Sequence, residues 1–258
     1  MGKFVGALGR KTIRSGNHLM ELCALTYRIT DIALPLPRIG RALIKRVIVE
    51  QVYFTAVQAL PVIIPIALII GSMMIVQFSQ LSGKVDLGKL VVLLILREIG
   101  PLITAIIVIL RSATAVTIEI SYMNVLHEID ALEMAGIDPF HVICFPRLVG
   151  ITTAVVSLIV VFDLMAIIGG YAVVRSTTIL PVEGFFNQIV KGVMGADIAV
   201  GILKGVFYGI TITVTCLYHG LNCKHQITQI PVATSRAAVE CLFYCLVINI
   251  FISFIYYV

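Results

Sequence analysis

The sequence predicts an all-α integral membrane protein with an N-terminal interfacial amphipathic helix, about five transmembrane helices, and a cytoplasmic loop with a short helix between spans two and three. Of its 258 residues, 59% are apolar and 13% are charged, and the mean hydropathy is +1.05, far from the balance of a soluble globular domain. A hydrocarbon core about 30 Å thick needs roughly 20 apolar residues per spanning helix, so this length supplies about five spans. Charge divides the chain into a basic segment, 1–46, and a transmembrane domain, 47–258.

The N-terminal segment is basic and moderately apolar over residues 3–32. It is too charged to span a membrane, and its pattern favours a helix that lies in the membrane surface. Pro35 and Pro37 end this helix, because proline lacks the N–H that a helix interior requires. No apolar stretch with a small-residue cleavage site precedes Pro35, so we expect no cleaved signal peptide.

The five expected spans follow from uninterrupted apolar stretches. Pro61 and Pro65 lie inside the first stretch and predict a bend there. The expected spans are Val47–Gln77, Leu90–Leu110, Leu148–Val174, Ile198–Tyr218 and Ala237–Val258.

Lysine and arginine predict the orientation, since positively charged loops are retained in the cytoplasm. Thirteen of these residues lie before span one, between spans two and three, or before span five; five lie on the other side, and Arg97 lies within the membrane. We therefore expect a cytoplasmic N-terminus and a C-terminus on the opposite side of the membrane.

The loop 112–147 holds many of the acidic residues in a chain that has only 14. If it is helical near 124–135, Val125, Ile129 and Leu132 form a narrow apolar stripe suited to a groove on a partner. Gly136 is a helix stop, and Asp138 followed by Pro139 predicts the start of a second short helix. The alternative is an ordinary solvated connection.

Ionisable residues within a membrane cost several kcal/mol unless they pair or line a wet cavity. Arg97 and Glu98 in span two are therefore the strongest site candidates. Arg97 offers a charge-assisted contact to a lipid phosphate, while Glu98 holds the arginine or senses the head group. The alternative is a structural ion pair that locks span two against another helix. Asp163 and Lys204 suggest a proton relay or an inter-helix tie, and we favour the tie.

Histidine, cysteine and glycine suggest packing rather than chemistry. The five histidines show no HxxxH or HExxH spacing and the six cysteines no CxxC, so we expect no metal site and no disulfide framework. We expect the cysteines to be small buried hydrophobes. Gly201, Gly205 and Gly209 form two overlapping GxxxG steps, a helix-packing signal for which a dimer seam is one use.

Motifs spread over nearly the whole chain resemble one known family. They are Leu96-Arg97-Glu98-Ile99-Gly100-Pro101, Arg111, Glu119, Ile129-Asp130-Ala131-Leu132 with Gly136, Asp138-Pro139, Pro146-Arg147, Phe162-Asp163 with Gly169-Gly170, and Ala233-Thr234 with Ala237–Val239. In this order they closely resemble the signature of the MlaE/YrbE permease family of MCE-associated ABC lipid transporters.

The resemblance implies a transport subunit rather than an enzyme. Family members are homodimeric or pseudodimeric permeases of the bacterial inner membrane that pair with two cytoplasmic ABC ATPases and a periplasmic MCE-domain protein. They move phospholipids or other lipids, a role connected with outer-membrane lipid asymmetry. The sequence contains no GxxxxGK[ST], consistent with ATP and Mg²⁺ bound by a partner chain and no cofactor on this one.

The resemblance also implies roles for particular residues. Lipid contacts would come from the pair in span two and the outer end of span one, and the loop would dock on the ATPase as a coupling element. The lipid-binding candidates are Arg97, Glu98, Gln77, Phe78 and Leu81; the coupling candidates are Glu119, Glu128, Asp130, Glu133, Asp138 and Pro139; Arg111, Asp163 and Lys204 are structural polar residues within the membrane.

Three positions depart from the family pattern and bear on which ATPase the loop fits. Ala113 and Ser121 stand where glycine is common, and His127 precedes Glu128 where the family commonly has Glu-Gln. A rival hypothesis is an ion-coupled secondary carrier using Arg97, Glu98 and Asp163, although such carriers usually show internal repeats and more spans. A membrane-embedded enzyme is disfavoured, because no catalytic constellation lies at a common depth.

Overall fold

The computed structural model describes residues 17–31, 41–79, 92–177, 195–223 and 226–257. Every regular element within these ranges is a helix. Five helical segments are long and apolar enough to cross a membrane, which confirms the predicted number of spans. They are Ile44–Met74, Ile95–Val125, Phe140–Val173, Asp197–Leu221 and Ile227–Tyr256.

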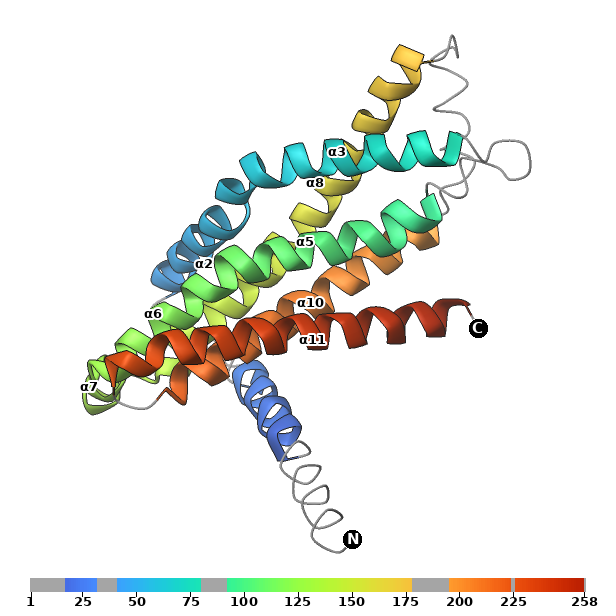
Figure 1. Ribbon diagram of the computed structural model, residues 1–258. Helices are drawn as coiled ribbons and strands as arrows, with labels where there is room; N and C mark the ends of the chain where they lie inside the picture. The colour runs from blue at the N-terminus through green and yellow to red at the C-terminus, as the bar shows by residue number, and fades with distance from the viewer. Residues whose placement is uncertain (1–16, 32–40, 80–91, 178–194, 224–225, 258) are drawn as a thin grey trace, which may run out of the picture.

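The spans run roughly alongside one another between two ends of the molecule (Figure 1). One end carries α7 (Glu128–Met134) and is called here the α7 end; the opposite end carries the C-terminus. The remaining elements are α2 (Arg41–Thr55), η1 (Val57–Ala59), α3 (Leu60–Ser79), η2 (Val92–Ile99), α5 (Gly100–Val108), η3 (Ile109–Ala113), α6 (Thr114–Val125), η4 (Phe140–Cys144), α8 (Phe145–Thr177), α10 (Gly195–Leu221), η5 (Ile227–Gln229) and α11 (Ile230–Tyr257).

Span one bends where proline requires it. The α-helix ends at Thr55, and the short 3₁₀ turn η1 connects it to α3, which takes a different direction (Figure 1). Pro61 has no N–H to donate to the carbonyl of Val57, and the N–H of Leu60 bonds that carbonyl instead. The predicted bend is confirmed and lies just before Pro61.

Spans two, three and five are longer than predicted, and span five begins at Ile227 rather than Ala237. The helix of span two continues past Leu110 to Val125, and span three begins at Phe140 rather than Leu148, so the connection shrinks to 126–139. Arg111 and Glu119 do not end the helix, because both have partners on neighbouring helices. Arg111 donates to the carbonyl of Phe54 at 2.9 Å, and Glu119 pairs with Arg147 at 2.7 Å.

Helix α8 is the central element and packs against α2, α3, α5 and α10. Glycines let α3 and α8 bring their backbones together. A Cβ on Gly71 would lie 2.0 Å from the carbonyl oxygen of Ala166, and one on Gly169 would lie 2.5 Å from that of Leu68. Neither position has room for a side chain, so these two glycines set the α3–α8 distance.

The GxxxG face of α10 is used inside the chain. A Cβ on Gly209 would lie 2.5 Å from Cα of Thr152, and one on Gly205 would lie 2.9 Å from Cδ1 of Ile159, both on α8. A Cβ on Gly201 would meet nothing within 4 Å. The dimer seam considered from the sequence is therefore wrong for Gly205 and Gly209.

The expected N-terminal helix is present over residues 17–31. Leu22 and Ile29 are buried against the spans, while Met20 and Tyr27 are exposed. Residues 1–16 lie outside the described ranges, and placement in the membrane surface stays a prediction. Of the six cysteines, Cys23 on this helix is exposed; the five others are buried as predicted, namely Cys144, Cys216, Cys223, Cys241 and Cys245.

Candidate functional site

A charged network joins span two to spans four and five at the end opposite α7. Arg97 forms an ion pair with Asp197, and Glu98 pairs with Lys204 at 3.1 Å. Both Asp197 and Lys204 belong to α10, where a separation of seven residues, about two turns, places them on one face. Arg97 and Glu98 lie in η2, a stretch of π-helix that leads directly into Gly100 and Pro101. Such wide turns recur at functional sites in helices.

Glu98 has further partners on α11. The hydroxyl of Ser253 donates to its Oε1 at 2.6 Å, and the amide of Asn249 donates to its Oε2 at 3.0 Å. Tyr208 of α10 donates to Asn249 at 2.7 Å, and so extends the network by one more hydrogen bond. The carboxylate therefore ties three helical segments together.

Lys204 is fully buried within this network. Its Nζ also donates to the carbonyl of Arg97 at 2.7 Å and to the hydroxyl of Ser253 at 2.8 Å. The side chains of Lys204 and Asp197 are 0% exposed, whereas those of Arg97 and Glu98 are 13% and 24% exposed. Of the four charged side chains, the two on η2 are thus the ones that are partly exposed, at the edge of the network.

This geometry corrects two interpretations of the sequence. Glu98 does not hold Arg97, because adjacent residues on a helix point in different directions and each meets its own partner on α10. Lys204 does form an inter-helix tie, but to Glu98 rather than to Asp163. Besides its ion pair with Asp197, the guanidinium of Arg97 lies 5.0 Å from the ring centroid of Tyr256, within the range of a cation–π contact.

Asp163 lies beside the start of α5. A Cβ on Gly100 would lie 2.4 Å from its Oδ1, so only glycine fits opposite this carboxyl group. Among the residues that the structure describes, this buried Oδ1 has no hydrogen-bond partner. The proposed relay from Asp163 to Lys204 has no direct contact to support it.

The other lipid-binding candidates lie partly beyond the described structure. Gln77 is exposed near the end of α3. The side chain of Phe78 is not described, and Leu81 lies outside the described residues. Their contact with lipid stays a prediction.

At the α7 end, a residue with a left-handed backbone conformation lies on each side of the short helix. His127, with φ 60°, separates α6 from α7, and Gly136, with φ 76°, ends α7. Asp138 then accepts a hydrogen bond at 3.0 Å from the backbone N–H of Phe140, as an N-cap does. Pro139 is buried. The predicted helix stop and restart are confirmed, but the restarted helix continues directly into span three.

The predicted apolar stripe of the loop faces its own chain. Ile129 is 8% exposed and Leu132 packs on the core, so these residues are not available to a partner's groove. That interpretation is wrong, because the sequence pattern does not reveal which surface a stripe meets. The exposed apolar side chains are instead Leu126, Met134 and Ile137.

The acidic coupling candidates divide into two groups. Glu128, Asp130 and Glu133 are exposed on α7, with Asp130 accepting a 2.7 Å hydrogen bond from His127. Glu119 and Asp138 stabilise the fold instead, through Arg147 and the N-cap described above. Three of the candidates are therefore placed to meet another molecule.

Several polar residues of the structure were missed from the sequence. Asp197 begins the apolar stretch of span four, and its seven-residue spacing from Lys204 was the signal available in the sequence.

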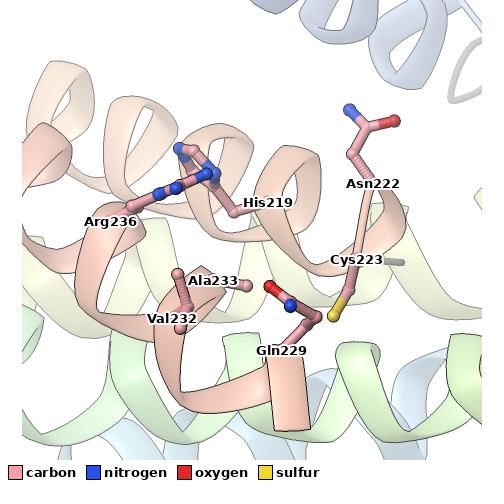
Figure 2. Close-up of a pocket in the computed structure, with 7 residues that line it drawn as sticks. All are labelled: His219, Asn222, Cys223, Gln229, Val232, Ala233 and Arg236. Carbon is pink, nitrogen blue, oxygen red and sulfur yellow. The ribbon is translucent and has the colours of Figure 1, made fainter. Parts of the chain in front are cut away.

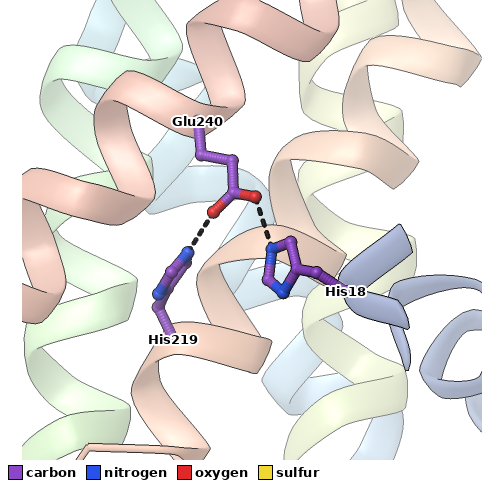
Figure 3. Close-up of side chains that lie close together, drawn as sticks. All are labelled: His18, His219 and Glu240. Carbon is purple, nitrogen blue, oxygen red and sulfur yellow. Dashed lines mark hydrogen bonds and ion pairs between the residues drawn. The ribbon is translucent and has the colours of Figure 1, made fainter. Parts of the chain in front are cut away.

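His219 connects two further features of the α7 end. It lines a pocket of about 200 Å³ (Figure 2) and lies close to His18 and Glu240 (Figure 3). The pocket is lined by His219, Asn222, Cys223, Gln229, Val232, Ala233 and Arg236.

Comparison with known proteins agrees with the sequence motifs. The family model described as Permease MlaE matches residues 48–255. The Intermembrane phospholipid transport system permease protein MlaE of Haemophilus influenzae is 28% identical over 242 residues, covering 92% of this chain and 91% of that protein. A probable ABC transporter permease protein of Rickettsia felis is 22% identical over 255 residues, covering 97% and 96%. A third, from Synechocystis, is 23% identical and covers 82% of both. This multi-pass membrane chain belongs to the MlaE permease family.

Proposed function

We propose that this chain is the membrane-spanning permease subunit of an ABC transporter that moves phospholipid or a related lipid between the bacterial inner membrane and a periplasmic MCE-domain partner. The observation that carries the proposal is the family match over 48–255, which takes in all five spans almost completely. The Haemophilus relative is named for intermembrane phospholipid transport, which supports this substrate class.

ATP hydrolysis would take place on a separate cytoplasmic ATPase that holds ATP and Mg²⁺. The exposed residues of α7 support a docking role, because the acids Glu128 and Glu133 and the apolar Met134 are all exposed, as is Leu126 just before the helix. A short helix with acidic and apolar exposed residues suits a basic-rimmed groove. We therefore assign α7 as the coupling helix and place the α7 end in the cytoplasm, which agrees with the distribution of lysine and arginine.

Two copies would form the lipid pathway. Helix α11 is the least buried span, and it exposes Phe243, Val247, Ile250 and Phe254 along its length. This face contacts either lipid or a second permease. The C-terminal end of α11 then lies toward the periplasm, where the MCE-domain protein would accept the lipid.

The charged network would hold span two in place and expose Arg97 at its edge. In this role Asp197 and Lys204 position Arg97 and Glu98, and a lipid phosphate would approach the guanidinium from its exposed side. The ion-coupled carrier is less well supported, because its three residues do not share partners. Arg97 pairs with Asp197, Glu98 pairs with Lys204, and the buried Oδ1 of Asp163 has no hydrogen-bond partner among the described residues.

Gentle purification tests this function. The full chain, tagged and extracted in mild detergent from its own host, should bring with it an ABC ATPase and an MCE-domain protein, together with stoichiometric phospholipid measured by mass spectrometry. If the chain purifies alone and without bound lipid, the permease proposal is wrong for this protein.

A further inference from the structure

Three side chains of metal-ligand type meet near the α7 end, from segments far apart in the sequence. His18 comes from the N-terminal helix, His219 from α10 and Glu240 from α11 (Figure 3). Nε2 of His18 contacts Oε1 of Glu240, and Nε2 of His219 contacts Oε2. The ligand atoms of all three residues lie within 4.8 Å of one another.

We propose that His18, His219 and Glu240 bind one divalent transition-metal ion of the Zn²⁺ class, which fastens the N-terminal helix to spans four and five. The proposed transport function does not require this site, and the site does not require that function.

The donor set suits zinc. Zinc in proteins takes imidazole nitrogen and carboxylate oxygen at about 2.0–2.2 Å, and three protein ligands leave a fourth position for water. Ligand atoms of such a tetrahedral site lie about 3.3 Å apart. The three ligand atoms already lie within 4.8 Å of one another, so adjustment of the side chains brings them toward this spacing.

Neighbouring groups already orient the three ligands. The hydroxyl of Tyr244 donates to Oε1 of Glu240 at 2.7 Å. The ring of Tyr218 lies edge-on to both imidazoles, with centroids 4.7 Å from His18 and 5.5 Å from His219. Supporting contacts of this kind fix ligand orientation in metal sites and contribute to their affinity.

An ion also has a way in. The side chains of His18, His219 and Glu240 are 24%, 15% and 21% exposed, so the cluster is shielded but not sealed. His219 also lines the pocket of about 200 Å³, which lies beside the cluster and is bordered by polar residues such as Asn222 and Gln229 (Figure 2). An entry path is one requirement for a functional metal site.

The direct test is metal content. The full chain is purified with a tag that contains no histidine, dialysed against Zn²⁺ at low micromolar concentration, and analysed by elemental mass spectrometry. We expect about one zinc per chain. A wild-type protein that holds no zinc under these conditions overturns the proposal and leaves a hydrogen-bonded triad.

Variants identify the ligands. His18→Asn and Glu240→Gln should each lower zinc affinity at least about 100-fold, because loss of even an outer-shell partner costs about 10- to 100-fold. His127→Asn, a change of the same type at an exposed histidine just before α7, should leave zinc binding unchanged. Zinc binding that is equal in all four proteins would place the ion elsewhere and overturn the assignment.

His18→Asn should leave the helix folded and docked, since Leu22 and Ile29 stay buried and Tyr218 still donates to Glu21 at 2.5 Å. The wild-type protein provides an independent measurement. Zn²⁺ should slow amide hydrogen exchange over residues 17–31, and Co²⁺ should give the intense visible absorption of a four-coordinate site. Unchanged exchange together with the weak spectrum of hydrated Co²⁺ would contradict the proposal.

Discussion

At the scale of single residues, the charged network shows how a membrane protein pairs its charged side chains so that they do not contact hydrocarbon. Arg97 and Glu98 could be singled out from the sequence, because an unpaired charge in a membrane costs several kcal/mol. The residues that pair with them could not be identified from the sequence. Asp197 and Lys204 lie about 100 residues away, and the rotation of α10 that brings them to η2 depends on packing against α8.

The pair of Glu98 and Lys204 should behave as one unit. Glu98→Gln leaves the ammonium of Lys204, which is 0% exposed, without its carboxylate, and should destabilise the protein by about 3 kcal/mol. Lys204→Met alone should also destabilise it, and the double variant should recover at least half of the summed loss. Thermal unfolding in detergent measures all three, and strictly additive losses would mean that the two residues do not interact.

Variants of the pair Arg97 and Asp197 distinguish a structural role of Arg97 from a role in lipid binding. Arg97→Ala should lower both stability and the amount of bound phospholipid. Exchanging the charges, Arg97→Asp with Asp197→Arg, should restore much of the stability because the ion pair is rebuilt across the same two helices. Bound lipid should stay low, since the arginine no longer lies at the exposed edge. Recovery of lipid binding in the exchanged protein would show that Arg97 acts only as a structural partner.

At the scale of elements, helix α7 illustrates a limit of pattern analysis. The sequence contains the helix stop at Gly136, the cap at Asp138 and the apolar stripe, and each of these features is found in the structure. Periodicity defines the apolar face of a helix but not what covers it. Here the chain itself covers Ile129, and the surface left for a partner is formed by residues outside the stripe.

Two substitutions in α7 should therefore affect different properties: one should lower the stability of the fold, and the other should weaken binding of the ATPase. Ile129→Ala should destabilise the folded chain by about 2–4 kcal/mol, because it leaves a cavity under α7. Met134→Ala, at a side chain that is 83% exposed, should leave the melting temperature unchanged and weaken binding of the ATPase. Pull-down and thermal unfolding of both variants check this. Weakened stability in Met134→Ala with normal ATPase binding would exclude the proposed docking face.

Charge on the same helix is tested separately. Glu128→Lys with Glu133→Lys should reduce lipid-stimulated ATP hydrolysis by the complex at least about tenfold, because like charges at an interface cost several kcal/mol. Asp31→Lys, at an exposed acid on the N-terminal helix outside the five spans, is the control and should retain wild-type activity. Equal activity in the α7 variant and the control would mean that acids on α7 do not contact the ATPase.

The glycines of α10 provide a second test at this scale. Gly209→Ala should destabilise the chain by about 1–3 kcal/mol, because the new methyl group would lie 2.5 Å from Cα of Thr152. Gly201→Ala, two turns earlier on the same helix, meets nothing within 4 Å and should be neutral or slightly stabilising. A similar loss in both variants would mean that the α8–α10 contact is not as close as described.

At the scale of the whole molecule, the number of spans followed from hydropathy, while their lengths did not. Hydrophobic length reports how much chain the membrane requires. The extensions of spans two and three depend on contacts between helices, such as that of Arg111 with Phe54 and that of Glu119 with Arg147. The meeting of His18, His219 and Glu240 likewise arises only when three distant helices pack together.

The most direct test of the central claim is ATP-driven lipid movement by the reconstituted complex. The full chain, its co-purified ATPase and the MCE-domain protein are placed in vesicles that contain fluorescent phospholipid, and transfer between membrane and acceptor is followed with and without ATP. Lipid transfer that requires both ATP and this chain is the predicted result. Transfer that is unchanged when the chain is omitted, or that does not depend on the ATPase, would contradict the account.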